Sequence, residues 1–315
     1  MYNNLEVFIL TYSRGNLLKD SLKSVCQQSV EGFDIIILDN ASTDNTKEVV
    51  EEIKKNYPSR NIVFESLEQN IGGISNFNRA SLLAQKEWAM IFHDDDLIHP
   101  DYIKKAMDSL KQNPDAVMVS CTFTEHESPD FTNWENFSGG YYIGDVKYFA
   151  ALMFGNLLHN FASTIYKTSL LKEYLFNGEL YGKIGDRPFM LEIAKHGKSI
   201  VLKDPYIRYR NHPGQDTNSF DSGPFAPEWF AFLHCYKAIL GNSWIDKYGI
   251  IYNLFVHSKL KMGYYWMKSV NSSMTFKMFK KQAVENNVIR KFEEPKFVEK
   301  ICKVVSSIYQ KFLYS

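Results

Sequence analysis

The stretch Phe33–Asp44, FDIIILDNASTD, is the part of this 315-residue sequence that says most about its fold. Its first half is an apolar run, which is typical of a strand covered on both faces. Its second half is polar and favours a turn into a helix that opens at Thr43. A buried strand that leads through a polar turn into a helix is the first half of a βαβ unit.

The same alternation runs through the first 120 residues. Short apolar runs predict further buried strands, and apolar residues at helical spacing predict a helix after each of them. We therefore expect an α/β fold with a mostly parallel central sheet and flanking helices on both faces. The predicted strands are Val7–Thr11, Phe33–Leu38, Ile62–Phe64 and Trp88–Phe92, and the predicted helices cover residues 17–25, 43–53 and 74–84.

The rest of the chain is less periodic, and a change of character near residue 225 predicts two domains. Residues 1–224 form the first, and residues 225–315 form a helical extension rich in Tyr, Phe, Trp and Met. In the middle region we predict helices over Asp145–Phe154 and Asp186–His196, strands over Ser199–Leu202 and Tyr206–Tyr209, and a loop over His212–Pro227. The loop is rich in Gly, Pro, Asn, Asp and Ser.

Composition narrows the class of protein. Hydrophobic residues make up 45% and charged residues 23%, which excludes wholesale disorder. The formal net charge is zero, which argues against a nucleic-acid partner. From residue 225 onward, however, 14 Lys+Arg face 6 Asp+Glu, so the extension carries +8 and the first 224 residues carry −8. Either the extension contacts an anionic membrane surface, or its aromatic residues pack its own core and its lysines face water.

The sequence also predicts the cellular compartment of the protein. The four cysteines are far apart, so a disulfide framework is not expected. The N-terminal residues lack the features of a signal peptide, and no window is apolar enough for a membrane-spanning helix. We predict a cytoplasmic protein, which is peripheral on the inner face of the cell membrane if the extension contacts lipid.

Polar motifs follow each of the first four predicted strands. In a parallel sheet, ligands bind beyond the carboxyl ends of the strands, so these motifs converge on one edge. No Gly-x-Gly-x-x-Gly and no Gly-Lys-Ser/Thr occurs, which argues against a dinucleotide fold or a phosphate-loop NTPase. The four motifs are Thr11–Arg14 (TYSR), Asp39–Asp44 (DNASTD), Asn70–Gly73 (NIGG) and Asp94–Asp96 (DDD).

The three consecutive aspartates are the strongest of these signals. Carboxylates delivered together into a cleft repel one another unless a cation lies between them, and Mg²⁺ or Mn²⁺ takes such oxygens together with substrate phosphates. The alternative is a solvated acidic turn before the helix that begins near Pro100. The position after a buried strand, beside the other motifs, favours the metal site.

The other motifs suggest a nucleotide. Asp39 ends a strand, where its carboxylate can accept the imide N–H of uracil or thymine; Thr43 and Asp44 are better placed to cap the next helix. Asn70 and Gly72 permit a tight turn close to a ligand. Asn78 and Arg79 follow on the next helix, and Arg79 is either a phosphate clamp or a surface cation.

These motifs occur in the order and spacing of a known family. Val7–Arg14, Asp39–Asp44, Asn70–Ala80 and Phe92–Pro100 together resemble the family 2 glycosyltransferases, over about the first 215 residues. The resemblance implies the A-type glycosyltransferase fold, a Rossmann-like nucleotide-diphospho-sugar transferase architecture. It also implies a nucleotide-diphosphate sugar, a divalent cation (Mn²⁺ or Mg²⁺) and inversion of the anomeric centre.

The resemblance assigns roles to residues. The residues expected at the nucleotide-sugar site are Thr11, Tyr12, Arg14, Asp39, Asn40, Asp44, Asn70, Gly72, Asn78, Arg79, Asp94 and Asp95. The metal ligands are expected to be Asp95 and Asp96 of a DxD motif, with His212 from a later family-like segment. Two departures are Leu10, where many relatives have Pro, and His93, where an additional Asp is common; the metal-facing pair is therefore Asp94/Asp96 or Asp95/Asp96.

Asp186 resembles the family's catalytic base, which takes the proton of the acceptor hydroxyl; its alternative role is to cap the helix it begins. The predicted function is thus transfer of a sugar, with UDP-sugar favoured, to a hydroxyl of a glycan or lipid-linked oligosaccharide. Two other functions remain open: a sugar-phosphate nucleotidylyltransferase, and a non-catalytic sugar-nucleotide or glycan-binding module.

Overall fold

The computed structural model describes residues 2–126, 134, 137–154, 161–212, 231–232, 234–236, 238–239 and 275–285. The chain forms two compact units, the first of residues 1–178 and 189–215 and the second of residues 179–188 and 216–315. The predicted boundary after residue 224 lies outside the described residues. The division into residues 1–224 and 225–315 therefore stays a prediction.

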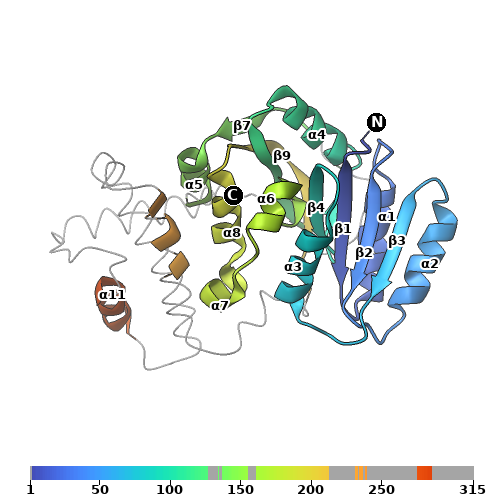
Figure 1. Cartoon of the computed structure of the whole chain (residues 1–315), viewed down its shortest axis with the longest axis horizontal. Coiled ribbons are helices and arrows are strands. Elements are labelled where there is room, and N and C mark those ends of the chain that lie inside the picture. The colour runs from blue at the N-terminus through green and yellow to red at the C-terminus, as the bar shows by residue number, and fades with distance from the viewer. Residues whose placement is uncertain are drawn as a thin grey trace. The chain divides into compact units, whose positions relative to one another are not determined.

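A nine-stranded sheet forms the centre of the first unit (Figure 1). Its strands follow the order β3-β2-β1-β4-β8-β6-β9-β5, and β7 pairs with β9. The strands are β1 (Leu5–Thr11), β2 (Asp34–Asp39), β3 (Asn61–Ser66), β4 (Trp88–His93), β5 (Leu97–Ile98), β6 (Ala116–His126), β7 (Tyr141–Gly144), β8 (Ile165–Lys167) and β9 (Lys198–Arg210).

Helices alternate with these strands, which confirms the predicted α/β class. The sheet is mixed: β1, β2, β3 and β4 run parallel, whereas β8 and β5 pair antiparallel with their neighbours. The helices are α1 (Gly15–Cys26), α2 (Thr46–Asn56), α3 (Gly73–Leu83), α4 (Tyr102–Gln112), α5 (Val146–Phe154), α6 (Thr168–Glu173), α7 (Gly178–Tyr181) and α8 (Asp186–Ala194), with short 3₁₀ turns at Phe161–Ser163 and Gly182–Ile184.

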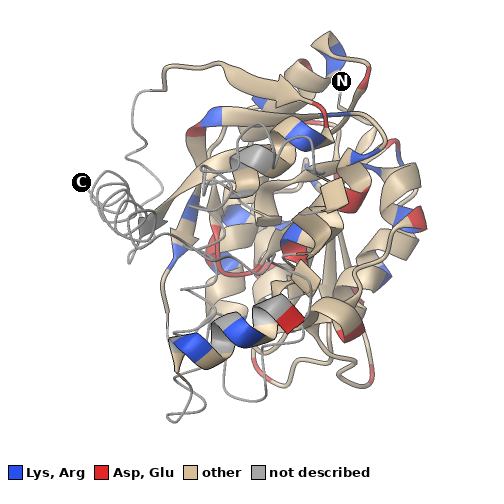
Figure 2. Ribbon diagram, turned by 90° about the vertical axis from the view of Figure 1, so that its left-hand side faces the viewer, with Lys and Arg blue, Asp and Glu red and all other residues tan. Residues whose placement is uncertain are grey.

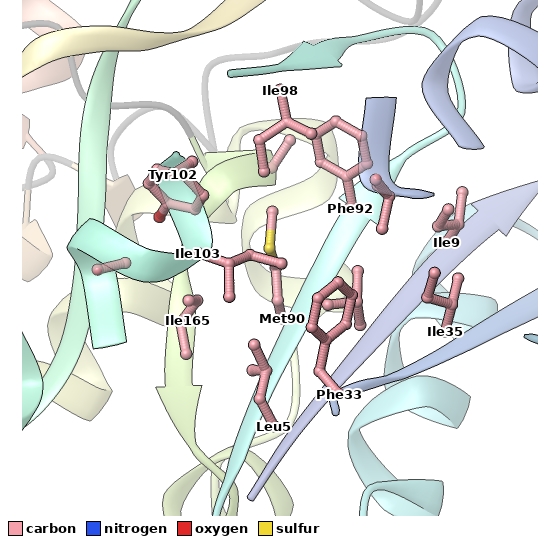
Figure 3. Close-up of a cluster of buried hydrophobic side chains, with 14 of the residues drawn as sticks. Leu5, Ile9, Phe33, Ile35, Met90, Phe92, Ile98, Tyr102, Ile103 and Ile165 are labelled. Atoms are coloured by element: carbon pink, nitrogen blue, oxygen red, sulfur yellow. The ribbon is translucent and has the colours of Figure 1, made fainter. Parts of the chain in front are cut away.

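Apolar side chains cover both faces of the sheet, as expected for continuous apolar strands. On one face, alternate residues of the strands pack against α1, α2 and α4, and Figure 3 shows part of this cluster around Ile9, Met90 and Phe92. On the other face, Phe77 of α3 packs against Phe161 and Phe189, with ring centroids 5.2 and 5.3 Å apart. The carboxyl ends of the central strands are thereby held in fixed positions.

Two predicted boundaries are corrected by the structure. Helix α2 begins at Thr46 rather than Thr43 because Asp44 folds the preceding turn, accepting a hydrogen bond from the Thr46 N–H at 3.1 Å. The two strands predicted over Ser199–Leu202 and Tyr206–Tyr209 are one strand, β9. Its register against β6 shifts between Leu202 and Ile207, a bulge that accommodates the residues separating the two apolar runs.

The C-terminal extension is described in part. Its described residues are helical at 231–232, 234–236 and 238–239 and in α11 (Phe276–Glu285), whose charged residues are coloured in Figure 2. Most of the predicted loop over His212–Pro227 lies outside the described residues. Among the described residues, none of the helices has the length and apolar character needed to span a membrane.

A single guanidinium ties the end of α1 to the start of β3. Arg60 donates to the backbone carbonyls of Cys26, Gln28 and Val30 at 2.6–2.8 Å. We predict that Arg60→Ala lowers the free energy of unfolding by about 2–4 kcal/mol, because three carbonyls lose a charged donor. Urea denaturation measures the change. Arg60→Lys should recover less than half of it, because an ammonium lacks the planar fork; full stability of Arg60→Ala would contradict the role.

Candidate active site

Pairing of the parallel strands brings the predicted motifs to one edge of the sheet. Thr11, the last residue of β1, lies opposite Asp39, the last residue of β2. On its other side β1 pairs with β4, where Leu10 lies opposite His93. The acidic triplet follows directly after His93. The ends of β1, β2 and β4 therefore form one polar edge, as the sequence predicted.

The three aspartates after β4 are buried together. Asp94, Asp95 and Asp96 are 3%, 8% and 0% exposed, which excludes the solvated acidic turn. Arg14 is their main counter-charge: its Nη1 lies 3.3 Å from Asp94 Oδ1 and 3.3 Å from Asp95 Oδ2. His212 Nε2 lies 3.1 Å from the same Asp95 oxygen.

Burial changes the protonation of these carboxyl groups. Burial, together with the Asp95 charge, raises the pKa of Asp94 to about 7, although Arg14 acts in the opposite direction. Burial likewise raises the pKa of Asp96 well above its usual value, with Asp95 again adding to the increase. A bound cation favours the ionised forms, because it compensates for lost hydration.

The donor atoms at this edge fit a divalent ion. Ligand atoms of His93, Asp95 and Asp96 lie within 4.8 Å of one another. Asp96 Oδ2 is buried and has no hydrogen-bond partner among the described residues. An orphaned carboxylate oxygen in a buried acidic group is what a hard cation requires. The arrangement thus supports a divalent metal site but does not select the ion.

Residues that the sequence reasoning missed hold Asp96 in place. The Arg210 backbone N–H donates to Asp96 Oδ1 at 3.2 Å, and Ser21 Oγ donates to the Asp96 carbonyl at 2.7 Å. The Arg210 side chain pairs with Asp20, with Nη2 and Oδ2 3.2 Å apart. Arg210 comes from the end of β9, 114 residues after Asp96. Local sequence patterns carry no signal for such a contact.

Asp39 lies in a pocket of hydroxyl and amide donors. Its carboxylate accepts hydrogen bonds from Ser42 N–H, at 3.1 and 3.2 Å, from Ser42 Oγ, and from Ser66 Oγ at 2.6 Å. The turn that makes this possible places Ala41 at φ 67°. Asp39 is 2% exposed, so these bonds fix the orientation of its carboxylate at the strand end.

Asp44 joins the starts of two helices. Its carboxylate accepts from the Gly15 N–H at 2.8 Å, at the start of α1, and from Thr46 at the start of α2. Burial alone raises the pKa of Asp44, but the hydrogen bonds from Thr46 and Gly15 outweigh it, and the pKa is lowered. Arg14, which contacts the acidic triplet, immediately precedes Gly15, so Asp44 fixes the backbone beside it.

Two asparagines connect the second and third strand ends. Asn40 Nδ2 donates to Asn70 Oδ1 at 2.9 Å, and Asn40 Oδ1 accepts from the Ile71 N–H at 2.9 Å. Gly72, at φ 84°, donates its N–H to Asn70 at 2.8 Å. Tyr12, another residue predicted at the nucleotide-sugar site, is 47% exposed.

The two predicted residues of α3 have different surroundings. Asn78 exchanges two hydrogen bonds with the backbone of Phe176, at 3.0 and 2.8 Å, and so ties α3 to the segment after α6. Arg79 pairs with Glu65 at 3.2 Å and reaches the Asp39 carbonyl at 3.5 Å. The contacts of Asn78 are structural, and those of Arg79 place it beside Asp39 rather than beside the triplet.

Asp186 is the first residue of α8 and falls in the second unit. The other predicted site residues belong to the first unit. The catalytic role of Asp186 stays a prediction, as do the ligand-binding roles of the residues described above.

Comparison with known proteins identifies the family. Residues 6–175, more than half of the chain, match the family model described as Glycosyl transferase family 2. The chain belongs to glycosyltransferase family 2.

Curated relatives of this family 2 glycosyltransferase are distant. An uncharacterized glycosyltransferase of Haemophilus influenzae is 22% identical over 69% of this chain and 68% of its own length. The putative glycosyltransferase EpsH of Bacillus subtilis is 22% identical over 66% of this chain and 61% of its own. A Campylobacter jejuni protein named GalNAc(5)-diNAcBac-PP-undecaprenol beta-1,3-glucosyltransferase is 26% identical over 56% of each chain.

Solved structures agree on the fold. S. aureus TarS 1–349 in complex with UDP-GlcNAc has a TM-score of 0.63 at 17% identity, covering 90% of this chain and 89% of TarS. The mannosyltransferase PcManGT from Pyrobaculum calidifontis, in complex with GDP-Man and Mn²⁺, has a TM-score of 0.53 at 15% identity, covering 97% and 86%. The A-type glycosyltransferase fold predicted from the sequence is confirmed, and family membership favours a transferase over the two alternative functions.

The buried triplet makes the stability of this glycosyltransferase depend on pH. The folded-state pKa of Asp94, about 7, exceeds its ordinary value of 3.8, so the metal-free folded protein loses stability as pH rises between these values. Asp94→Asn removes this loss. We predict that, with both proteins in EDTA, the melting temperature of the variant minus that of wild type is roughly 5 °C larger at pH 8 than at pH 5. A pH-independent difference would contradict the assignment.

Proposed function

We propose that this family 2 glycosyltransferase is an inverting, divalent-metal-dependent enzyme that transfers a sugar from a UDP-sugar to a hydroxyl of a glycan or lipid-linked glycan. The observation that carries the proposal is the buried triplet Asp94–Asp96 beside Asp39 on one edge of the sheet. A nucleoside diphosphate needs both a polar base site and a cation site for its phosphates.

The base site is assigned to Asp39. A carboxylate held by Ser42 and Ser66 is oriented before the ligand arrives, which favours acceptance of an imide N–H and hence uracil. Arg79, which reaches the Asp39 carbonyl, is placed near the same base. The TarS complex contains a UDP-sugar, which supports this choice of donor.

The cation site is assigned to Asp95 and Asp96. A divalent ion held there supplies positive charge that stabilises the departing diphosphate. Arg14, which contacts Asp94 and Asp95, is assigned to a phosphate oxygen of the donor. His212, which contacts Asp95, is assigned to the same site as a ligand of the ion or of the diphosphate. PcManGT, which was crystallised with Mn²⁺, supports the metal requirement.

Asp186 is assigned as the general base. An inverting transfer needs a carboxylate that accepts the proton of the acceptor hydroxyl while the oxygen attacks the anomeric carbon opposite the leaving group. The first turn of a helix, where Asp186 lies, stabilises an ionised carboxylate and so keeps it able to accept a proton.

The acceptor is assigned by chemistry and by relatives. The Campylobacter jejuni relative is named for an undecaprenol diphosphate glycan, and a Staphylococcus epidermidis relative, 29% identical over 35% of this chain, is named a poly-beta-1,6-N-acetyl-D-glucosamine synthase. A bacterial surface glycan or its lipid-linked precursor is therefore the favoured acceptor.

The first experiment separates transfer from donor binding. We predict that Asp186→Asn lowers transfer at least about 100-fold, because the general base is lost, and leaves UDP affinity within about twofold. Calorimetry with UDP measures the UDP affinity. Release of UDP from a panel of UDP-sugars, with a lipid-linked glycan extract as acceptor, measures transfer. Glu179→Gln, an exposed change in the same unit, should alter neither. Unchanged transfer by Asp186→Asn would remove the base assignment.

A second experiment concerns the location of the enzyme. The net charge of +8 after residue 224 predicts that the full chain floats with vesicles containing anionic lipid, and that salt weakens this binding. Vesicles of neutral lipid are the control. Binding to neither would defeat the peripheral membrane assignment, and equal binding to both would defeat its electrostatic basis; neither result bears on the transfer reaction.

A further inference from the structure

The His93 side chain lies next to the acidic triplet, but it holds no part of the fold by a hydrogen bond within the described residues. It is the last residue of β4 and immediately precedes the triplet. Its ring lies edge-on to Phe161, with centroids 6.1 Å apart. Among the described residues, His93 makes no hydrogen bond and no ion pair. Its ring nitrogens are therefore available to a ligand.

The hydrogen bonds of the neighbouring aspartates divide their oxygens into two sets. Asp95 Oδ2 is engaged by Arg14 and His212, and Asp96 Oδ1 by the Arg210 N–H. Asp95 Oδ1 and Asp96 Oδ2 make no hydrogen bond within the described residues, and Asp96 Oδ2 is buried. The contacts thus leave one oxygen of each aspartate for another partner.

One ligand atom from each of His93, Asp95 and Asp96 can converge on one ion. The ligand atoms of His93, Asp95 and Asp96 lie within 4.8 Å of one another. When two ligand atoms lie on opposite sides of an ion, each about 2.1 Å from it, they are about 4.2 Å apart. Small side-chain movements therefore bring the ligand atoms to bonding distance of one ion. His93 is the last residue of β4, and Asp95 follows it by two residues, so the sheet holds both close to the site.

We propose that His93 supplies a nitrogen ligand to the cation site formed with Asp95 and Asp96, and that this nitrogen gives the site a preference for Mn²⁺ and Co²⁺ over Mg²⁺. The inference rests on the proposed metal-dependent function and adds a residue and an ion preference to it.

The preference follows from ligand chemistry. Magnesium is a hard ion that favours oxygen and keeps several waters, whereas affinity for nitrogen increases along the first transition row from Mn²⁺ to Co²⁺ and beyond. Exchanging one oxygen ligand for an imidazole therefore strengthens binding of Co²⁺ most, Mn²⁺ less and Mg²⁺ least. A site made of carboxylates alone shows a smaller difference among these ions.

The test uses the full chain and Mn²⁺, with and without UDP. Electron paramagnetic resonance counts the bound Mn²⁺, and electron spin echo modulation detects a nitrogen-14 nucleus coordinated to it. His93→Asn is compared with His93→Asp, which offers an oxygen ligand instead. His196→Asn, at an exposed position, is the matched control, and each His93 variant is also made in a His212→Asn background, which removes the other histidine that contacts Asp95. Titration calorimetry measures Mg²⁺ and Co²⁺ affinities of each variant.

We expect imidazole modulation in wild type, His196→Asn and His212→Asn, and its loss when either His93 variant is combined with His212→Asn while Mn²⁺ remains bound. His93→Asp should lower the ratio of Co²⁺ to Mg²⁺ affinity at least about tenfold. Modulation that persists when His93→Asp is combined with His212→Asn, or that disappears in His212→Asn alone, overturns the inference and leaves the proposed function standing. Failure of wild-type protein to bind Mn²⁺ overturns both. Circular dichroism confirms that each variant is folded.

Discussion

Three buried carboxylates, two of which share the Arg14 guanidinium, are the constraint on which the rest of this structure depends. Removing one charge from water costs several kcal/mol unless it gains a partner, and Asp94, Asp95 and Asp96 are removed together. Arg14 supplies one positive charge to two of them. The Arg210 backbone N–H offsets part of the remaining free-energy cost by donating to Asp96. The raised pKa values of Asp94 and Asp96 offset another part, because these groups then bind protons and are no longer charged.

This constraint explains the second half of the sheet. Strands β1 to β4 alone would leave the triplet at an open edge. Strand β9 runs parallel to β6 and then pairs antiparallel with β5, the short strand directly after the triplet. The pairing places Arg208 opposite Leu97 and carries Arg210 and His212 to the aspartates. The mixed sheet is thus a means of closing the acidic site from its far side.

The sequence predicts what local patterns determine. Apolar runs and helical spacing locate the first four strands and the helices between them, and parallel pairing then brings Thr11, Asp39 and the triplet to one edge. Contacts between distant segments are not predictable in this way. The bond between Arg210 and Asp96 spans 114 residues, and the two bonds of Asn78 with Phe176 span 98. Their residue types would suit many other roles equally well.

The same limit applies to individual ligand atoms. The sequence places His93 beside three aspartates, but a histidine at a strand end is equally suited to packing or hydrogen bonding. Only the contacts distinguish these roles: the partners of Asp95 and Asp96 occupy one oxygen of each, and His93 makes no hydrogen bond within the described residues. Because a cation bound by the folded state alone stabilises it, filling the proposed cation site offsets the cost of burying the triplet. Binding and folding are therefore coupled through the same oxygens, and a protein that lacks the ion is less stable at neutral pH than its core would permit.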